Sequence, residues 1–550
     1  MYALVNIPRV KSLIVVFAAL ATAMAAHAAP PHFARQGTTQ QLIVDGKPFL
    51  ILGGELGNSS SSSAEYMRPH WPRLKAMNLN TVLAPVSWEL IEPSEGKFDW
   101  TSVDELLRDA RAQDLKLVIL WFGAWKNSMS TYVPAWVKRD QARFPRAQLT
   151  NGSSVEILSA FSANTRDADA RAFGAFMEYL KSVDGEKNTV LMVQVENEIG
   201  MLPIARERGP VADKLFAGAV PTELTRALST NQGRLEPELL DLWQKSGKKS
   251  SGTWAQLFGD AEAGQEVFTA WHYARFVEAL VVAGKKRYDI PLYVNVALNR
   301  IGRKPGEYPS GGPLPHLLDV WKAGTPTTDM LSPDIYFPNF AQLAARFNRP
   351  DNVLFIPEAN NATNSQVSAN AFYSFGELDS LGFSPFSIES LSDAPNALSL
   401  SYAVLKQLTP ILLDARGDGR LGGFRATINE DGSVIDSPVK KKLGGIEFTV
   451  TFIDPWTPRD KQTIADHGGL VIHAGGEDFW FAGSGITITF KGMDGGPPLV
   501  GIDVAEEGVF VNGKWQPGRR LNGDQTHQGR HIRLPPGNSQ IQKVRFYRYR

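Results

Sequence analysis

The pattern of apolar and polar positions predicts eight β-strands between residues 49 and 388, with helical patterns between several of them. This alternation is typical of an α/β fold with a parallel sheet, and eight units over about 370 residues favour a (β/α)8 barrel with insertions. A doubly wound open sheet also alternates, but no G-x-G-x-x-G motif or P-loop follows the first strand. The predicted strands are Phe49–Leu52, Thr81–Val86, Lys116–Trp121, Thr189–Val195, Leu292–Val296, Met330–Tyr336, Val353–Pro357 and Gly382–Ile388.

Two helical patterns place their apolar side chains on one face. Phe173, Phe176, Met177 and Leu180 follow the spacing i, i+3, i+4, i+7, and residues 103–110 repeat this pattern before the third strand. After the fourth strand, roughly seventy residues rich in Gly, Pro, Ser and charge precede the next helical pattern, a length typical of a functional insertion. We expect this insertion on the C-terminal face of the barrel, either as a lid or subsite or as an excursion without ligand contact.

The sequence pattern changes after about Arg416. Paired glycines separate short alternating runs such as Ile446–Phe452 and Ile486–Phe490, which predicts an all-β domain. We therefore expect a catalytic barrel over residues 30–415 and a β-rich accessory domain over residues 416–550.

The N-terminus has the pattern of a cleaved secretory signal. Arg9 and Lys11 precede an apolar run over residues 13–26, and Ala26-His27-Ala28 has the form of a cleavage site. The run is short for a bilayer span, although an N-terminal anchor remains the alternative. A signal peptide over residues 1–28 predicts a secreted or periplasmic protein, and a chain without cysteine tolerates an oxidising compartment.

Composition narrows the chemistry. Lys+Arg and Asp+Glu balance at 57 each, so no net charge favours nucleic acid or an anionic membrane, and an uncharged substrate suits the chain. There is no cysteine, the nine histidines form no H-E-x-x-H motif or other close ligand pair, and G-x-S-x-G is absent. We therefore expect neither a metal, nor a cofactor, nor a serine nucleophile.

Two strand ends carry the carboxylates that glycoside hydrolysis needs on either side of the scissile bond. The fourth strand ends with Glu196, Asn197 and Glu198, and the seventh with Pro357 and Glu358. Strand alternation puts Glu196 and Glu198 on one face and does not choose between them. Proline cannot donate to the strand ladder, so Pro357 fits the last position of its strand and leaves Glu358 at the rim.

Several motifs resemble those of retaining glycosidases on (β/α)8 barrels. Residues 88–100, WELIEPSEGKFDW, are similar to a pattern after the second strand of family 35 and family 42 β-galactosidases. Val195–Gly200, VENEIG, is close to the VENEYG run of family 35, and Gly53-Gly54-Glu55 matches that family's first strand. The segment after Glu55 and the segment Gly123–Asn127 depart from the family pattern, and the second departure affects sugar contacts.

The resemblance implies a retaining β-galactosidase that acts by double displacement. It implies that Glu198 is the general acid/base, that Glu358 is the nucleophile, and that Asn197 contacts the hydroxyl next to the anomeric carbon. Glu198 must then have the higher pKa in the free enzyme. Residues 518–524 resemble an accessory domain of a bacterial branch of family 35, some of whose members act on galactosylated plant polysaccharides.

Other residues are candidates for sugar contacts, because a galactose ring packs its apolar face on aromatic rings. The aromatic candidates are Trp88, Trp121, Trp125 and Tyr336, all near strand ends, where aromatics also cap a barrel core. Glu55 and Lys126 are polar candidates. Glu389 is a rival carboxylate, and Glu196 is a candidate buried partner of an arginine elsewhere in the chain. Glu89, Glu92 and Glu95 are interpreted as solvated or structural.

Two further functions remain open. The first is a β-glycosidase of another specificity, such as a glucosidase, mannosidase or endo-glucanase, because contacts to the sugar hydroxyls decide the specificity. The second is a non-catalytic carbohydrate-binding barrel, which would keep aromatic side chains but lose a carboxylate. Both glutamates are present, which argues against the second alternative.

Overall fold

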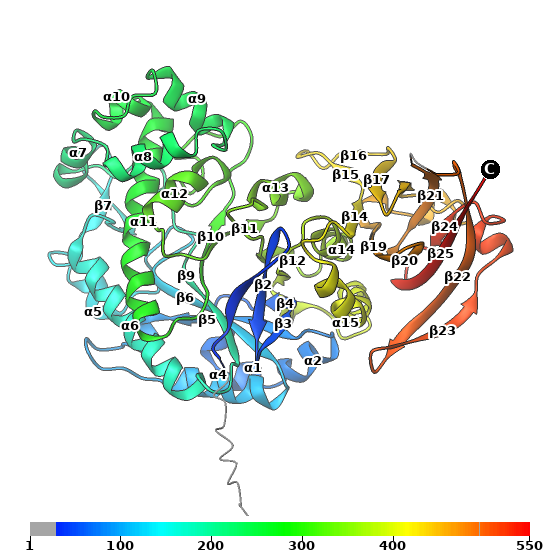
Figure 1. The fold of residues 1–550 in the computed structure, drawn as a ribbon. Helices are drawn as coiled ribbons and strands as arrows, with labels where there is room; N and C mark the ends of the chain where they lie inside the picture. Colours follow the sequence, from blue (N-terminus) through cyan, green and yellow to red (C-terminus); the bar gives the residue numbers. More distant parts are fainter. Residues whose placement is uncertain (1–28, 494–495) are drawn as a thin grey trace, which may run out of the picture.

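A closed barrel of eight parallel strands forms the larger part of the molecule (Figure 1). The computed structural model describes residues 29–493 and 496–550, so the predicted signal peptide lies outside the described residues. Each barrel strand pairs with its neighbours along the chain, which confirms the predicted (β/α)8 architecture. The strands are β4 (Ile51–Glu55), β5 (Thr81–Ser87), β6 (Lys116–Lys126), β9 (Val190–Asn197), β10 (Leu292–Ala297), β11 (Met330–Ile335), β12 (Ile356–Asn361) and β13 (Gly382–Phe386).

Amphipathic helices cover the outside of the barrel. In α6 (Ala163–Asp184) the predicted apolar residues are buried, and the ring of Phe173 lies 5.6 Å from that of Trp121 on β6. The Ser162 side chain caps the first turn by accepting a hydrogen bond from the backbone N–H of Thr165. The other helices around the barrel are α1 (Ala64–Met67), α2 (His70–Ala76), α3 (Trp88–Ile91), α4 (Thr101–Ala112), α5 (Ala135–Arg139), α11 (Glu262–Arg287), α12 (Leu318–Gly324), α13 (Phe340–Phe347), α14 (Val367–Glu377) and α15 (Ala397–Ala415).

The long insertion after β9 folds into short helices. Figure 1 shows them gathered at one end of α11. Their contacts are apolar: the ring of Trp254 lies 5.2 Å from that of Phe268, on α11. The helices are α7 (Pro210–Phe216), α8 (Thr222–Thr230), α9 (Pro237–Lys245) and α10 (Trp254–Phe258).

Residues after Leu421 form an all-β region with a core of its own, between a six-stranded and a four-stranded sheet. Phe448 of the smaller sheet packs against Phe479, Phe481 and Phe546 of the larger one. The larger sheet has the order β14 (Leu421–Arg425), β19 (Gly468–Gly475), β20 (Asp478–Ser484), β25 (Gln540–Tyr549), β22 (Leu499–Val511), β23 (Lys514–Arg520). The smaller one has β17 (Val439–Leu443), β18 (Ile446–Thr451), β21 (Ile486–Gly492), β24 (Ile532–Leu534).

The all-β region packs tightly on α14, the helix that follows β12. A Cβ added at Gly376 on α14 would lie 2.8 Å from the carbonyl oxygen of Gly422, and one added at Gly423 would lie 2.6 Å from the backbone N of Glu377. The Glu377 carboxylate accepts hydrogen bonds from Gly423 N at 3.1 Å and from Lys441 Nζ at 2.7 Å. Helix and sheet backbones therefore approach closely enough to require glycine on both sides.

A three-stranded sheet precedes the barrel and contacts its last helix. It consists of β1 (His32–Gln36), β2 (Thr39–Val44) and β3 (Lys47–Phe49). The Gln41 side chain donates to the carbonyl of Leu413 at 2.6 Å. Across residues 29–493 and 496–550, no helix has the length and apolar character to cross a membrane.

Candidate active site

Three carboxyl groups meet where the barrel strands end at the C-terminal face. Glu198 directly follows β9, Asp334 lies near the end of β11, and Glu358 lies in β12. One oxygen of each carboxyl lies within 4.8 Å of the others, and the residues are only 6%, 1% and 5% exposed. The structure thus brings together the two predicted catalytic glutamates and an aspartate that the sequence analysis missed.

The backbone at the end of β9 separates Glu196 from Glu198. Both have left-handed φ angles, 61° and 47°, which are uncommon for residues other than glycine and store strain at functional sites. Glu196 contacts the outer side of the barrel, where it accepts hydrogen bonds from the backbone N–H of Ala124 and Trp125 at 3.2 and 2.7 Å. Its carboxyl also pairs with Asp169 of α6, not with the arginine that we considered. Glu198 alone joins the carboxyl cluster.

Asn295 on β10 holds both Glu198 and Asp334. Its Oδ1 accepts a hydrogen bond from the backbone N–H of Glu198 at 2.9 Å, and its Nδ2 donates to Oδ2 of Asp334 at 2.6 Å. Asp334 is the register partner of Glu358 across β11 and β12.

Strand β12 continues past Pro357 to Asn361, so the expectation that Pro357 ends its strand is wrong. Pairing between β12 and β13 shifts register after Ile356, which accommodates the proline.

Three further predicted residues contact this cluster. The Tyr336 hydroxyl donates a hydrogen bond to Oε1 of Glu358. Glu55, at the end of β4, is 1% exposed, and neither of its oxygens accepts a bond from a donor in the described part of the chain. Lys126, at the end of β6, places its positive charge near Glu55 and Glu198, and its ammonium donates to Asn127.

Burial dominates the electrostatics of the cluster. The pKa of Glu198 is raised to about 7, first by burial and then by the Glu358 charge, while Lys126 and a hydrogen bond with Asp334 act in the opposite direction. The pKa values of Glu55 and Asp334 are also raised well above the usual range, first by burial and then by Glu358. Burial and mutual repulsion therefore favour the protonated forms of Glu55, Asp334 and Glu198.

Asn197 is buried, and both polar atoms of its amide lack a hydrogen-bond partner among the described residues.

The structure does not bring the three predicted tryptophans to the carboxyls. Trp88, Trp121 and Trp125 are 0% exposed. Trp121 donates to Asp169 at 3.0 Å, and Trp125 packs against Phe276 of α11. Strand β6 shifts register against β9 between Trp121 and Lys126, so simple alternation does not predict which side chains face the site.

The rival carboxylates have structural contacts. Glu389 accepts hydrogen bonds from the backbone N–H of Gly57, at 2.8 Å, and from the Ser60 hydroxyl, which fixes the loop after β4. Glu92 accepts from Trp88 Nε1 at 2.8 Å and from Gly96 N at 2.7 Å. Glu89 pairs with Lys138 and Glu95 with Arg143 on the surface. The motif over residues 88–100 thus stabilises a loop and contributes no carboxyl to the cluster.

We do not interpret the three carboxyls as a metal centre, although their spacing would admit a divalent cation. Oδ2 of Asp334 accepts from Asn295 and Oε1 of Glu358 accepts from Tyr336, so one oxygen of each already has a donor. The ammonium of Lys126 supplies positive charge to the same group. The arrangement fits acid–base chemistry with retained protons.

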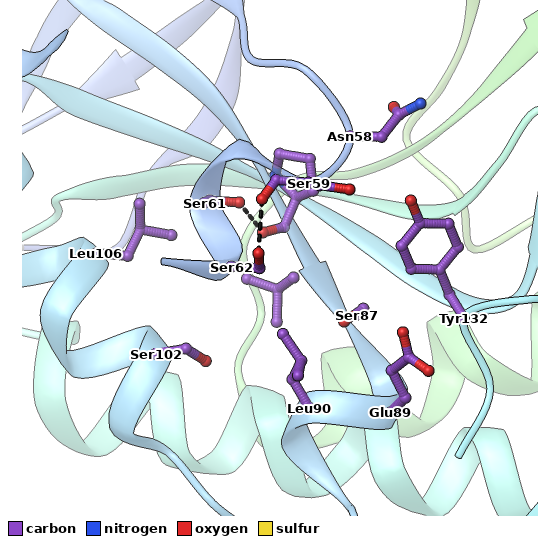
Figure 2. Close-up of a pocket in the computed structure, with 12 residues that line it drawn as sticks. Asn58, Ser59, Ser61, Ser62, Ser87, Glu89, Leu90, Ser102, Leu106 and Tyr132 are labelled. Atoms are coloured by element: carbon purple, nitrogen blue, oxygen red, sulfur yellow. Dashed lines mark hydrogen bonds between the residues drawn. The ribbon is translucent and has the colours of Figure 1, made fainter. Parts of the chain in front are cut away.

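A pocket of about 180 Å³ opens at the barrel rim between the loop after β4 and α3 (Figure 2). Some hydroxyls are already engaged: Ser61 donates to the carbonyl of Pro85 and Ser62 to that of Ser59. Tyr132 packs on Phe122, whose ring also lies 5.2 Å from the ammonium of Lys126. The pocket is lined by hydroxyl and other polar side chains, Asn58, Ser59, Ser61, Ser62, Ser87, Glu89, Ser102 and Tyr132, and by apolar ones, Pro85, Val86, Leu90 and Leu106.

The model of glycosyl hydrolases family 35 matches residues 41–227. This segment, called the family 35 segment below, is similar to that family. The family 35 segment contains Glu55, Lys126 and Glu198, whereas Asp334 and Glu358 lie beyond it. A second model, a domain of unknown function designated DUF5597, matches residues 398–533, from the last barrel helix into the all-β region.

Curated relatives of the family 35 segment are β-galactosidases. It is 31% identical over 191 residues to the β-galactosidase of Xanthomonas manihotis, covering 33% of this chain and 29% of that protein. It is 30% identical over 160 residues to β-galactosidase 8 of Oryza sativa subsp. japonica, covering 28% and 22%. The matched region thus spans less than a third of either relative.

Solved structures with a similar fold include the catalytic domain of a β-amylase from Paenibacillus polymyxa, with a TM-score of 0.46 and 12% identity, covering 65% of this chain and 98% of that one. The β-galactosidase of Marinomonas ef1 has a TM-score of 0.44 and 14% identity, covering 68% and 63%.

Proposed function

We propose that this protein is a retaining β-glycosidase, most specifically a β-galactosidase that releases terminal galactose from oligo- or polysaccharides. Glu358 is the nucleophile and Glu198 the general acid/base. The observation that carries the proposal is the pairing of these two carboxyls at the barrel mouth, with oxygens within 4.8 Å. Retaining enzymes separate their carboxyls by roughly 5–5.5 Å and inverting enzymes by about 6.5–9.5 Å, so the spacing supports retention.

The first half of the reaction uses the opposite protonation states of the two groups. Ionised Glu358 attacks the anomeric carbon while protonated Glu198 donates its proton to the departing oxygen. Burial raises the pKa of Glu198 to about 7, so the acid form persists in neutral solution. Tyr336 donates to one oxygen of Glu358, which orients the other toward the sugar.

The second half reverses the role of Glu198. Once Glu358 is esterified, its negative charge is gone, and the pKa of Glu198 falls because that charge was one of the causes that raised it. Glu198 then accepts a proton from water, which attacks the anomeric carbon and releases Glu358. Galactose as the sugar rests on the relatives of the family 35 segment, whose printed names are β-galactosidases.

Covalent trapping tests this assignment. A 2-fluoro galactoside with a dinitrophenyl leaving group should inactivate the enzyme, release one equivalent of dinitrophenol and label the peptide that contains Glu358. NMR of the first product should show the β-anomer. Labelling at Glu389, or an α-anomer as first product, would contradict the mechanism. A panel of nitrophenyl gluco-, manno- and galactosides tests the sugar separately, since trapping by another sugar would preserve the mechanism and change the specificity.

We further propose that the protein is exported to the periplasm or medium and acts there on galactosides, including fragments of plant cell-wall polysaccharide. The support is the signal-like pattern of residues 1–28 and the absence of cysteine from the sequence. Fractionation of the native host and N-terminal sequencing test this, with a mature chain beginning after Ala28 as the expected result. A cytoplasmic protein that retains Met1 would contradict export without affecting the catalytic proposal.

A further inference from the structure

Asp334 is the member of the carboxyl cluster that the proposed mechanism does not use. It is 1% exposed, lies on β11 beside Glu358, and its carboxyl lies within hydrogen-bonding reach of Glu198. Its Oδ2 accepts from Asn295, whereas Oδ1 has no donor among residues 29–493 and 496–550. Two carboxyl groups in contact form a hydrogen bond only when one of them carries a proton.

We propose that Asp334 is a positioning residue that keeps its own proton and donates it in a hydrogen bond to Glu198 whenever Glu198 has lost its proton. This inference rests on the proposed function, in which Glu198 alternates between acid and base. The proton that reaches the leaving oxygen comes from Glu198, and the proton of Asp334 stays on Asp334 throughout. Asp334 thereby stabilises the carboxylate form of Glu198 without adding a negative charge.

Asn295 gives this hydrogen bond its direction. The Nδ2 of Asn295 donates to Oδ2 of Asp334. The other oxygen, Oδ1, is therefore the one that we assign to the proton and to the contact with Glu198. The Oδ1 of Asn295 simultaneously accepts from the backbone N–H of Glu198, at the residue whose φ is 47°. One amide therefore fixes both partners of the proposed bond.

The surroundings of Asp334 favour its neutral form. Burial is the largest cause that raises the pKa of Asp334 well above the usual range. The next causes are the negative charges of Glu358, Glu198 and Glu55, whereas the positive charge of Lys126 lowers this pKa. An ionised Asp334 would place a further negative charge in a cluster with a single ammonium. The titratable or charged groups that face it are Glu358, Glu198, Glu55, Lys126, Tyr293 and Tyr336.

Two substitutions distinguish a neutral donor from an ionised neighbour. Asp334→Asn keeps the shape, the acceptor for Asn295 and an N–H donor for Glu198. The alkaline midpoint of kcat/KM should therefore stay within roughly 0.5 unit of the wild type. Asp334→Leu removes the donor and should raise that midpoint by about one unit or more, because the Glu198 carboxylate loses a hydrogen bond. Asp334→Ala replaces the leucine variant if that does not fold.

Asp169→Asn is the matched control, because Asp169 is also a buried aspartate paired with a glutamate of the same strand segment. It should leave the midpoint unchanged. A downward shift of a unit in Asp334→Asn would show that Asp334 is ionised and would overturn the proposal. An unmoved midpoint in both Asp334→Leu and Asp334→Ala would also overturn it, because it would show a merely structural role.

A measurement without substrate separates this inference from the proposed function. Carboxyl 13C NMR of protein labelled at glutamate Cδ follows the titration of Glu198, whose signal is assigned by its loss in Glu198→Gln. The midpoint should be near 7 in the wild type and in Asp334→Asn, and higher in Asp334→Leu. If the wild type hydrolyses no glycoside, the function fails, while the same three midpoints still support or overturn the hydrogen bond.

Discussion

Two carboxyl pairs lie at the end of β9, one on each side of the barrel wall. Glu196 meets Asp169 on the outer side, and Glu198 meets Asp334 at the mouth. All four are buried, and burial is the first cause that raises the pKa of each. The difference lies in the remaining contacts. Glu196 and Asp169 bond to backbone N–H groups and an indole, whereas Asp334 and nearby Glu358 each keep an oxygen without a donor in the described residues.

This contrast shows that burial and a raised pKa do not by themselves identify a catalytic acid. The outer pair has the same perturbation, but its oxygens are occupied by the fold. Around the inner pair, Asp334 and Glu358 each keep a buried oxygen without a donor in the described residues, and a substrate would supply the missing partners. Substitutions on the two sides of the wall should therefore affect different measurements.

The largest effect is expected for Glu358, the proposed nucleophile. Glu358→Gln should lower kcat on a galactoside by at least about 10⁴-fold, because no covalent intermediate forms. Steady-state hydrolysis of a nitrophenyl galactoside measures it. Glu389→Gln is the matched control, since Glu389 contacts the loop at Gly57, and it should retain most of the activity. If Glu389→Gln lost activity and Glu358→Gln retained it, Glu389 rather than Glu358 would be the nucleophile.

A smaller loss of activity is expected when Glu198, the proposed acid/base, is replaced. Glu198→Ala should lower kcat/KM on an unactivated oligosaccharide by about 10²–10⁴-fold, since protonation of the leaving oxygen is lost. A dinitrophenyl galactoside should still react at the first step, and azide should restore turnover by replacing water. Full activity on the oligosaccharide would rule out Glu198 as the acid.

The outer pair should instead determine stability. Glu196→Ala leaves the backbone N–H of Trp125 without its acceptor and separates Asp169 from its partner, whereas the N–H of Ala124 still donates to Asp169. At about 1–3 kcal/mol for the unsatisfied N–H of Trp125 and about 1 kcal/mol for the lost bond between the two carboxyls, the free energy of unfolding should fall by about 2–4 kcal/mol. Urea denaturation measures the change, and the pH profile of kcat/KM should stay in place. A shifted profile without loss of stability would place Glu196 in the reaction.

The smallest effect is a pH dependence of stability. The pKa of Glu198 is raised from 4.5 to about 7 in the folded protein, so the folded state holds the proton more tightly than the unfolded one. Its contribution to stability is complete below pH 4.5 and is lost as the pH rises to about 7. Relative to Glu198→Gln, the wild type should lose on the order of 2 kcal/mol over this interval. If the urea midpoints of the two proteins changed by the same amount over this pH interval, the raised pKa of Glu198 would be contradicted.

Much of the fold could be predicted because buried parallel strands appear as uninterrupted apolar runs. All eight predicted runs became barrel strands, and Glu198 and Glu358 do meet at the ends that the runs indicated. The tryptophans Trp88, Trp121 and Trp125 were predicted to contact the sugar because they lie near strand ends. Strand alternation fails in β6, where the pairing with β9 shifts register, and the rings of Trp121 and Trp125 pack toward the helices.

Two features of the site had weaker signals in the sequence. Strand alternation could not separate Glu196 from Glu198, because the left-handed φ of Glu196 turns the chain in a way that alternation does not contain. Asp334 was overlooked although it had a visible signal, a carboxylate inside the apolar run from Met330. An aspartate in a buried strand is costly unless it has a partner, and this rule would have directed attention to the position two residues before Tyr336.

The glycine contacts between α14 and the all-β region have a consequence for how the chain unfolds. At Gly376 and Gly423 the two backbones approach too closely for a side chain at either position. Helix α14, which follows the strand of Glu358, thus has its outer surface covered by the all-β region. Separating the two would expose close-packed backbone to water, and we therefore expect barrel and sheets to melt in a single calorimetric transition.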